Sequence, residues 1–233
     1  MMKENLFKIL FLIFVLQSCA TKTKITEITS NIPADQEKTW GLDISHYQDV
    51  YDWEKLRAQE MGFIFVKATE GSDFQDHKYA EYYKTIRRLK IPVGSYHFFT
   101  YLSTGQNQAK NFLTNAKIQP GDLLPVLDAE FAKKMPEKNI VKKELLDFVN
   151  AIYNKIGFYP IIYCPYNYYL QYVKGNLPTK CKLWIVDYRG RPNCEWTFWQ
   201  TTEKYRVQGI KGYVDFNRFY GVKKDLKSLM IKD

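Results

Sequence analysis

Short β-rich runs alternate with amphipathic helical patterns along most of this chain, and this alternation limits its fold more than any other feature. Six runs have strand character: residues 40–44, 63–68, 92–98, 123–127, 160–163 and 183–186. Helical periodicity occupies three of the intervals between them, at residues 76–89, 104–116 and 137–156. Regular alternation of strands and helices predicts a parallel sheet with crossover helices, which is either an α/β barrel or a doubly wound sheet.

The pattern changes after Asp187, where strand-like runs at 196–200 and 212–216 have turn-like sequence between them instead of a long helix. A barrel built from this chain would therefore lose its helices near its end.

Polar residues capable of chemistry stand at the ends of several apolar runs. They are Asp43, Glu70, His97, Asp128 with Glu130, Asp187, Gln200 and Asp215. In an α/β barrel the C-terminal strand ends open on one face, where active sites are built, so these scattered residues become a ring in space. Any chain turns polar where a strand ends, so the recurrence supports a site more strongly than any single residue does.

Asp128 and Glu130 are two carboxylates one residue apart at the end of an apolar run. Side chains at i and i+2 of a strand point to the same side, with Cα atoms roughly 6 to 7 Å apart. Two like charges held that close raise the pKa of at least one of them, which keeps a carboxylic acid protonated at neutral pH. This arrangement suits a glycosidase. The alternative is a strand that leaves the core and meets solvent.

The N-terminus has the features of an exported protein. Lys3 precedes an apolar run at 6–16, which is too short to span a bilayer but suits a signal peptide. The run leads into Leu-Gln-Ser-Cys, which resembles a bacterial lipobox and implies cleavage before Cys19 and lipidation of its sulfur. We expect a signal peptide at 1–18, a flexible tether at 19–38 and a lipoprotein of the cell envelope, with an ordinary secreted protein or an uncleaved anchor as alternatives.

Net charge and composition limit the classes of molecule that this protein could bind. The net charge is +9, from 34 basic and 25 acidic residues, and a basic surface attracts polyanions. Nucleic acid is a poor candidate for an exported protein without a nucleic-acid motif, which leaves anionic cell-wall polymer, a membrane surface or simple solvation. Aromatic residues make up 16% of the chain, which suits both a sugar-stacking cleft and an aromatic core.

The cysteines and histidines predict no metal and no cofactor, because no Cys or His pair has the spacing of zinc ligands. Cys181 and Cys194 could form a disulfide in an oxidising compartment, which the sequence leaves open.

Seven segments, in order and covering most of residues 40–221, resemble the glycoside hydrolase family 25 lysozymes. They are GLDISHYQ (41–48), FVKATEG (65–71), VGSYHF (93–98), LPVLDAE (124–130), LWI (183–185), FWQ (198–200) and VDFNRF (214–219). The resemblance implies a flattened TIM-like barrel of five βα units followed by strands with few helices. We place this domain at 39–225, followed by a C-terminal tail at 226–233.

The resemblance also implies hydrolysis of the β-1,4 bond between N-acetylmuramic acid and N-acetylglucosamine in peptidoglycan. Position by position, Glu130 corresponds to the general acid, Asp128 to its partner, and Asp43 and Asp215 to flanking acids. Asp128 either attacks the anomeric carbon or orients the acetamido group of the substrate as the nucleophile, and the short Asp-x-Glu spacing favours the second role.

Six further residues are candidates for substrate binding: Tyr96, His97, Tyr163, Asp187, Trp199 and Gln200. Core packing explains the aromatic members equally well, and a buried histidine such as His97 more often satisfies a neighbouring group than a substrate. Asp187 follows Val186, where the family usually has a small residue, so Asp187 is expected either in a subsite or on the rim.

Two other functions remain open. A glycan-binding lipoprotein could keep the barrel without turnover, although the intact set of four acids argues against it. A metal-dependent phosphodiesterase would need several histidine ligands, whereas only His46 and His97 lie near candidate strand ends.

Overall fold

The computed structural model describes residues 39–232. The predicted signal peptide at 1–18, the tether at 19–38 and the lipidated Cys19 lie outside these residues. Among the helices of the described part, none has the length and apolar character needed to cross a bilayer.

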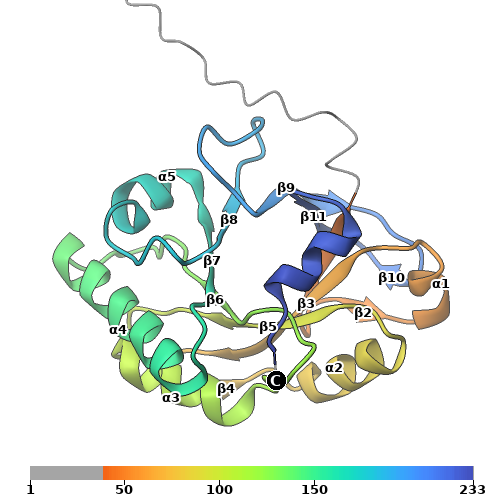
Figure 1. Ribbon diagram of the computed structural model, residues 1–233, viewed down its shortest axis with the longest axis horizontal. Coiled ribbons are helices and arrows are strands. Elements are labelled where there is room, and N and C mark those ends of the chain that lie inside the picture. Colours follow the sequence, from red (N-terminus) through yellow and green to blue (C-terminus); the bar gives the residue numbers. More distant parts are fainter. Residues whose placement is uncertain (1–38, 233) are drawn as a thin grey trace, which may run out of the picture. The chain divides into compact units, whose positions relative to one another are not determined.

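A closed barrel of eight strands forms the centre of the molecule (Figure 1). The strands are β1 (Trp40–Ile44), β3 (Phe63–Glu70), β5 (Val93–Phe98), β6 (Val126–Asp128), β7 (Ile161–Pro165), β8 (Leu183–Val186), β9 (Phe198–Tyr205) and β11 (Val214–Phe219). The first seven run parallel in this order, whereas β11 runs antiparallel to both of its neighbours, β9 and β1. Because β1 pairs with both β3 and β11, the sheet has no gap, and the predicted TIM-like barrel is confirmed.

Three very short strands extend this sheet or lie beside it. β4 (Phe74–Gln75) pairs with the end of β3, and β2 (Asp49–Val50) pairs with β10 (Ile210–Lys211). They shape the loops on the β1 and β3 side of the barrel.

Helices follow the first five barrel strands, as Figure 1 shows. They are α1 (Trp53–Arg57), α2 (Tyr79–Arg88), α3 (Gly105–Asn115), α4 (Lys138–Ile156) and α5 (Tyr166–Tyr168), which continues into a π-helical turn, Tyr169–Val173. Between β8 and β11 the described chain contains no helix, so the predicted loss of helices is confirmed. The caps agree with local sequence, since the Thr104 side chain accepts a hydrogen bond from the Asn107 N–H at the start of α3, and Gly157 ends α4 at φ 76°.

The strands separate two apolar clusters, because alternate side chains of a strand point to opposite faces. Outward-facing residues such as Leu127 and Ile162 pack in the same cluster as Phe148 of α4. Inward-facing residues such as Phe65 and Trp184 fill the barrel, with ring centroids 4.7 Å apart. Much of the aromatic content is therefore core.

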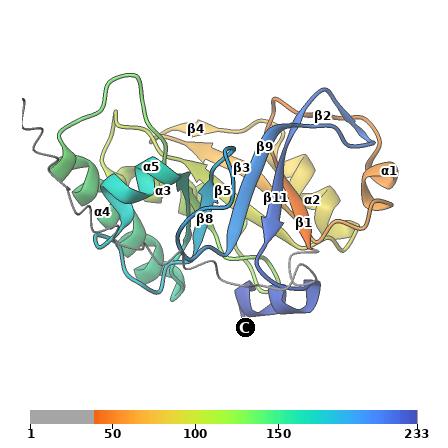
Figure 2. The same ribbon diagram turned by 90° about the horizontal axis from the view of Figure 1, so that it is seen from above.

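A 3-10 helix, Lys223–Leu229, lies across the end of the barrel opposite the site described below (Figure 2). Its Leu226 and Leu229 are buried in the inner cluster, and the Leu124 N–H donates to the Leu229 carbonyl at 2.8 Å. Residues 226–231 of the predicted tail therefore pack against the barrel, and the predicted domain boundary at 225 divides this helix.

The direction of β11 corrects one further prediction. Asp215 was expected at the end of the eighth strand, but it is the second residue of β11. Because β11 runs opposite to the other strands, its start lies on the face where their C-terminal ends open, and Asp215 pairs with Asp43 of β1. Asp215 therefore lies on the predicted face of the barrel, but at the start of its strand and not at its end.

Candidate active site

An open cavity of about 610 Å³ lies at the C-terminal ends of the parallel strands, mainly over β7, β8 and β9. Its walls are formed by Glu130, Tyr163, Pro165, Tyr166, Asn167, Val186, Asp187, Tyr188, Arg189, Gln200, Glu203 and Asp215. Acids, amides and tyrosines dominate this wall, which is the polar and aromatic composition that a sugar requires.

Asp128 and Glu130 lie side by side, as their spacing predicts, and share a hydrogen bond. Asp128 ends β6 and is 8% exposed, whereas Glu130 reaches the cavity wall. Burial is the main cause that raises the pKa of both carboxyls, and the nearby charge of Asp43 raises both further. Because the pKa of each carboxyl is raised and the two are joined by a hydrogen bond, the pair retains a proton that both groups share.

One oxygen of Asp128 lacks a partner. Its Oδ1 atom is buried and has no hydrogen bond within the described residues. An unpaired buried acceptor costs about 1–3 kcal/mol, so this atom favours an arriving donor.

Asp43 and Asp215 form a second acid pair across the β1 and β11 ladder. The Oδ2 atom of Asp43 accepts hydrogen bonds from Asn217 Nδ2 at 2.7 Å and from Gln200 Nε2 at 3.2 Å. Burial raises the pKa of Asp215 to about 9, with further contributions from the charge of Asp43 and the hydrogen bond between the two carboxyls. Asp215 is therefore protonated at neutral pH and donates to Asp43.

Gln200 joins this pair to the cavity wall. Its Oε1 accepts hydrogen bonds from the hydroxyls of Tyr163 at 3.0 Å and Tyr188 at 2.9 Å, while its amide donates to Asp43. The side chain makes these three hydrogen bonds and is 1% exposed, so it holds Asp43 and both tyrosines in fixed positions.

A buried cation balances part of this negative charge. Lys67 of β3 is 6% exposed and forms an ion pair with Glu70 at 2.6 Å. Its ammonium lies 4.9 Å from the centroid of the Phe98 ring. The positive charge of Lys67 lowers the pKa of both Asp128 and Glu130, which opposes the increase that burial causes.

Asp187 lines the cavity and forms a bidentate ion pair with Arg189, at 2.9 and 3.0 Å. The Arg189 guanidinium is the main cause that lowers the pKa of Asp187. Trp199 does not line the cavity. Its indole N–H donates to the Asp187 carbonyl at 2.9 Å, and its ring packs edge-on against Trp196. Asp187 therefore lies on the cavity wall, and its place in a substrate subsite stays a prediction. Trp199 lies behind Asp187, so its position does not support the predicted contact with substrate.

His97 also lies away from the cavity. It is completely buried on the outer face of β5, where its ring stacks on Phe148 and its nitrogens face Thr69 Oγ1 at 2.7 Å and Gln108 Oε1 at 3.1 Å. Burial lowers the pKa of His97 to about 4, so the ring is neutral. The prediction of His97 as a substrate-binding residue is therefore wrong, because its side chain is buried outside the barrel and does not reach the cavity.

Tyr96, the neighbour of His97, packs against the inner cluster of the barrel. Burial and the charges of Asp43, Asp128 and Asp215 raise its pKa well above the usual range, which places the phenol near these acids. It is not part of the cavity wall.

Several residues of this site were missed from the sequence, among them Lys67, Tyr188, Arg189, Glu203 and Asn217. Asn217 carried a signal that could have found it, since it lies two residues after Asp215 on one strand and must face the same side. The Asn217 side chain also accepts the indole N–H of Trp184 at 2.8 Å.

Cysteines contribute no covalent link to this region. Cys164, Cys181 and Cys194, which are all the cysteines in residues 39–232, are free. The disulfide between Cys181 and Cys194 is therefore not formed.

A barrel whose mouth holds two hydrogen-bonded carboxyl pairs with raised pKa values is typical of glycoside hydrolases, which use paired acids to cleave sugar linkages. The family model for glycosyl hydrolases family 25 matches residues 42–210, which is more than half of the chain. The chain belongs to glycoside hydrolase family 25 and is an enzyme of that class.

The chain is similar to several known proteins. The Escherichia coli K12 protein YegX is 29% identical over 199 residues, which cover 82% of this chain and 72% of YegX. A family 25 glycosyl hydrolase from Bacillus anthracis superposes with a TM-score of 0.78 at 32% identity, covering 83% of this chain and 94% of that structure. A bacterial lysozyme from Streptomyces coelicolor superposes with a TM-score of 0.77 at 26% identity, covering 82% and 96%.

Proposed function

We propose that this enzyme is a muramidase that hydrolyses the β-1,4 bond between N-acetylmuramic acid and N-acetylglucosamine in peptidoglycan. One observation carries the proposal: Asp128 and Glu130 share a proton beside a cavity whose other acids, Asp43 and Asp215, form a second pair. The similarity to a Streptomyces lysozyme supports the choice of substrate.

Glu130 is the general acid in this proposal, because it reaches the cavity wall and Asp128 lies beneath it. Glu130 protonates the glycosidic oxygen as the bond to the anomeric carbon breaks, and it then removes a proton from the water that attacks this carbon. General acid catalysis of this kind contributes about 10² to 10⁴-fold.

Asp128 orients the acetamido group of the muramic acid in the proposed mechanism. Its unpaired Oδ1 is a suitable acceptor for the acetamido N–H. Because this new hydrogen bond favours ionised Asp128, the shared proton moves across to Glu130, where the leaving oxygen needs it. The acetamido oxygen then attacks the anomeric carbon, and the resulting cyclic intermediate is opened by water.

Asp43 and Asp215 add negative potential beside the developing positive charge of the sugar ring. The Asp43 carboxyl is held by hydrogen bonds from Asn217 and Gln200, so it faces that charge without moving. Protonated Asp215 lines the cavity and offers hydrogen bonds to the sugar.

The decisive experiment digests purified peptidoglycan and identifies the fragments by mass spectrometry. Muramic acid at the new reducing ends supports the proposal, whereas glucosamine at these ends, or no release, contradicts it. Peptidoglycan with de-N-acetylated muramic acid should resist cleavage, because it lacks the proposed nucleophile. If it is cleaved at the same rate, Asp128 acts directly instead.

We also propose that a lipid on Cys19 holds the enzyme in the cell envelope, which the lipobox-like sequence before Cys19 supports. Labelled fatty acid should be incorporated into the full chain and not into Cys19→Ser, which should leave the membrane fraction. Membrane retention of the unlabelled variant would contradict the anchor.

A further inference from the structure

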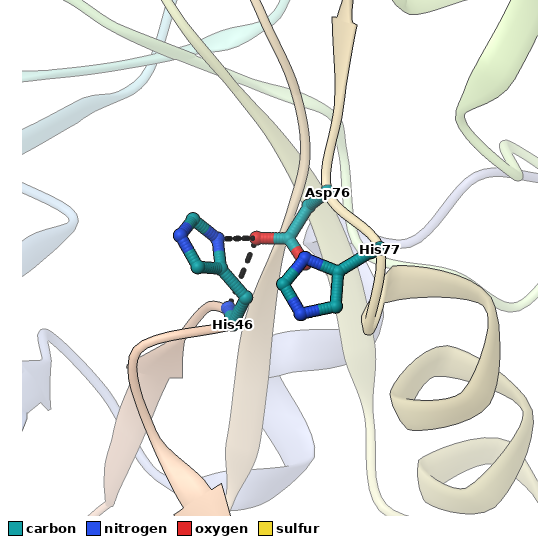
Figure 3. A group of neighbouring side chains, drawn as sticks. All are labelled: His46, Asp76 and His77. Carbon is teal, nitrogen blue, oxygen red and sulfur yellow. Dashed lines mark hydrogen bonds and ion pairs between the residues drawn. The ribbon is translucent and has the colours of Figure 1, made fainter.

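A cluster of two histidines and an aspartate lies outside the catalytic cavity, on the loops that follow β1 and β4 (Figure 3). His46, Asp76 and His77 each offer a ligand atom, and these atoms lie within 4.8 Å of one another. None of the three lines the cavity. The sequence concealed this cluster, because His46 is separated from the other two by about thirty residues.

We propose that His46, Asp76 and His77 bind a divalent transition-metal ion of the zinc class. This inference is independent of the proposed hydrolysis.

Two of the three ligands are already held in place. The Asp76 side chain is 1% exposed, and its Oδ2 accepts hydrogen bonds from the backbone N–H of His46 at 3.0 Å and faces the His46 Nδ1 at 2.7 Å. Its Oδ1 accepts the Lys78 N–H at 2.9 Å, which fixes the turn before α2. Buried and tethered side chains lose little entropy on binding an ion.

The third ligand can adjust. His77 is exposed, and its ring centroid lies 5.1 Å from that of His46. Metal–ligand bonds of about 2.0–2.2 Å require tetrahedral ligand atoms roughly 3.3 Å apart. A rotation of the His77 side chain would bring in the third ligand, and the 2.7 Å contact between His46 Nδ1 and Asp76 Oδ2 would lengthen as the ion replaces the shared proton. In Figure 3 the His46 Nε2 points away from Asp76, where it can carry the imidazole proton once Nδ1 binds the ion.

Neighbouring charge does not oppose an ion here. The ammonium of Lys78 is directed to the Gln48 carbonyl at 3.3 Å and to Asp49 Oδ1 at 3.6 Å. Two imidazoles and one carboxylate favour zinc, nickel or cobalt over the oxygen-seeking Mg²⁺ and Ca²⁺, and they leave a coordination position for water. The ion would join the loop after β1 to the turn before α2.

The test uses the untagged full chain, because a polyhistidine tag binds the same metals. The chain contains three histidines, so imidazole NMR yields three resonance sets, and the buried His97 is an internal control. Added Zn²⁺ should shift the His46 and His77 resonances at one equivalent and leave His97 unchanged. A hundredfold excess of free Zn²⁺ over Kd should raise Tm by roughly 5 to 10 °C. Mg²⁺ should do neither.

His77→Gln should abolish this response without unfolding the protein, since His77 is exposed, while Asp73→Asn at a nearby exposed carboxylate should preserve it. Zinc binding that leaves both imidazoles unshifted, or that is unchanged in His77→Gln, would overturn the proposal, as would the absence of binding.

Discussion

Glu130 and Asp128 share a proton but differ in access, because Glu130 reaches the cavity and Asp128 does not. Glu130→Gln keeps the shape and removes the transferable proton. We expect turnover to fall by about 10²-fold or more, while glycan binding and Tm stay close to those of the parent. Release of dye from labelled cell walls measures turnover. Glu81→Gln, at an exposed glutamate of α2 outside the cavity wall, is the control and should retain parental activity. Parental activity in Glu130→Gln would remove Glu130 from the mechanism.

The ion pair of Lys67 and Glu70 should influence the pH dependence of activity. Lys67→Met removes the cation that lowers the pKa of Asp128 and Glu130, so the pH–activity profile should move to higher pH. Glu70→Gln removes the counter-charge of Lys67, so the profile should move to lower pH. Lys84→Met, at an exposed position of α2, should leave the profile unchanged. Shifts of both pair variants in the same direction would contradict an electrostatic role, because a structural disturbance would not have opposite signs.

At the scale of elements, α3 and α4 approach closely at Gly105. A Cβ atom on Gly105 would lie 1.9 Å from the Glu144 carbonyl oxygen, and the Gly105 N–H donates to Glu144 Oε2 at 2.7 Å. We expect Gly105→Ala to reduce the free energy of unfolding by about 1–3 kcal/mol, because the helices must separate. Urea denaturation measures the change. Gln106→Ala, at the next and exposed position, should be nearly neutral. Equal stability of the two variants would show that the contact is not restrictive.

The elements also show how far sequence reasoning reaches. All eight barrel strands and three helices were predicted near their observed positions, because each forms a long apolar run or a strong helical period. The two-residue strands β2, β4 and β10 and the short α1 carry too little pattern to be recognised. The reversed direction of β11 depends on its distant partners β1 and β9, and no local pattern records it.

In the site too, features set by local sequence spacing were predictable, and contacts between distant segments were not. The Asp128 and Glu130 pair was predictable because residues at i and i+2 share a face. The same rule applies to adjacent residues of a strand, which cannot both face the inside of a barrel. Tyr96 and Gln200 face inward, so their neighbours His97 and Trp199 face outward and are excluded as substrate contacts. The His46 and Asp76 contact joins separate loops, so spacing along the chain could not reveal it.

At the scale of the whole molecule, buried acids link stability to pH. The pKa of Asp215 is raised from 3.8 to about 9 in the folded state, so its contribution is fully present below about pH 4 and is lost as pH rises toward 9. His97, with its pKa lowered to about 4, acts oppositely as pH falls below 6.5. Above pH 7 the ring of His97 is neutral in both states, so His97 adds nothing to the pH dependence there.

Asp215→Asn should therefore be more stable than the parent, and the difference should grow from pH 7 to pH 8.5 by at most about 1.4 kcal/mol per unit. Urea denaturation at both pH values measures it, with Asp73→Asn at an exposed position as the control. A constant difference across this interval would mean that Asp215 is already ionised in the folded protein.

β1 is the first barrel strand in the sequence and β11 is the last, and the two pair with each other. Asp43 and Asp215 are therefore far apart along the chain and meet only when β11 has joined the barrel. The 3-10 helix that follows β11 then seals the far end of the barrel. A chain of which β11 has not yet been synthesised has one half of this acid pair and no finished catalytic centre. The catalytic centre is therefore completed only when β11 has paired with β1.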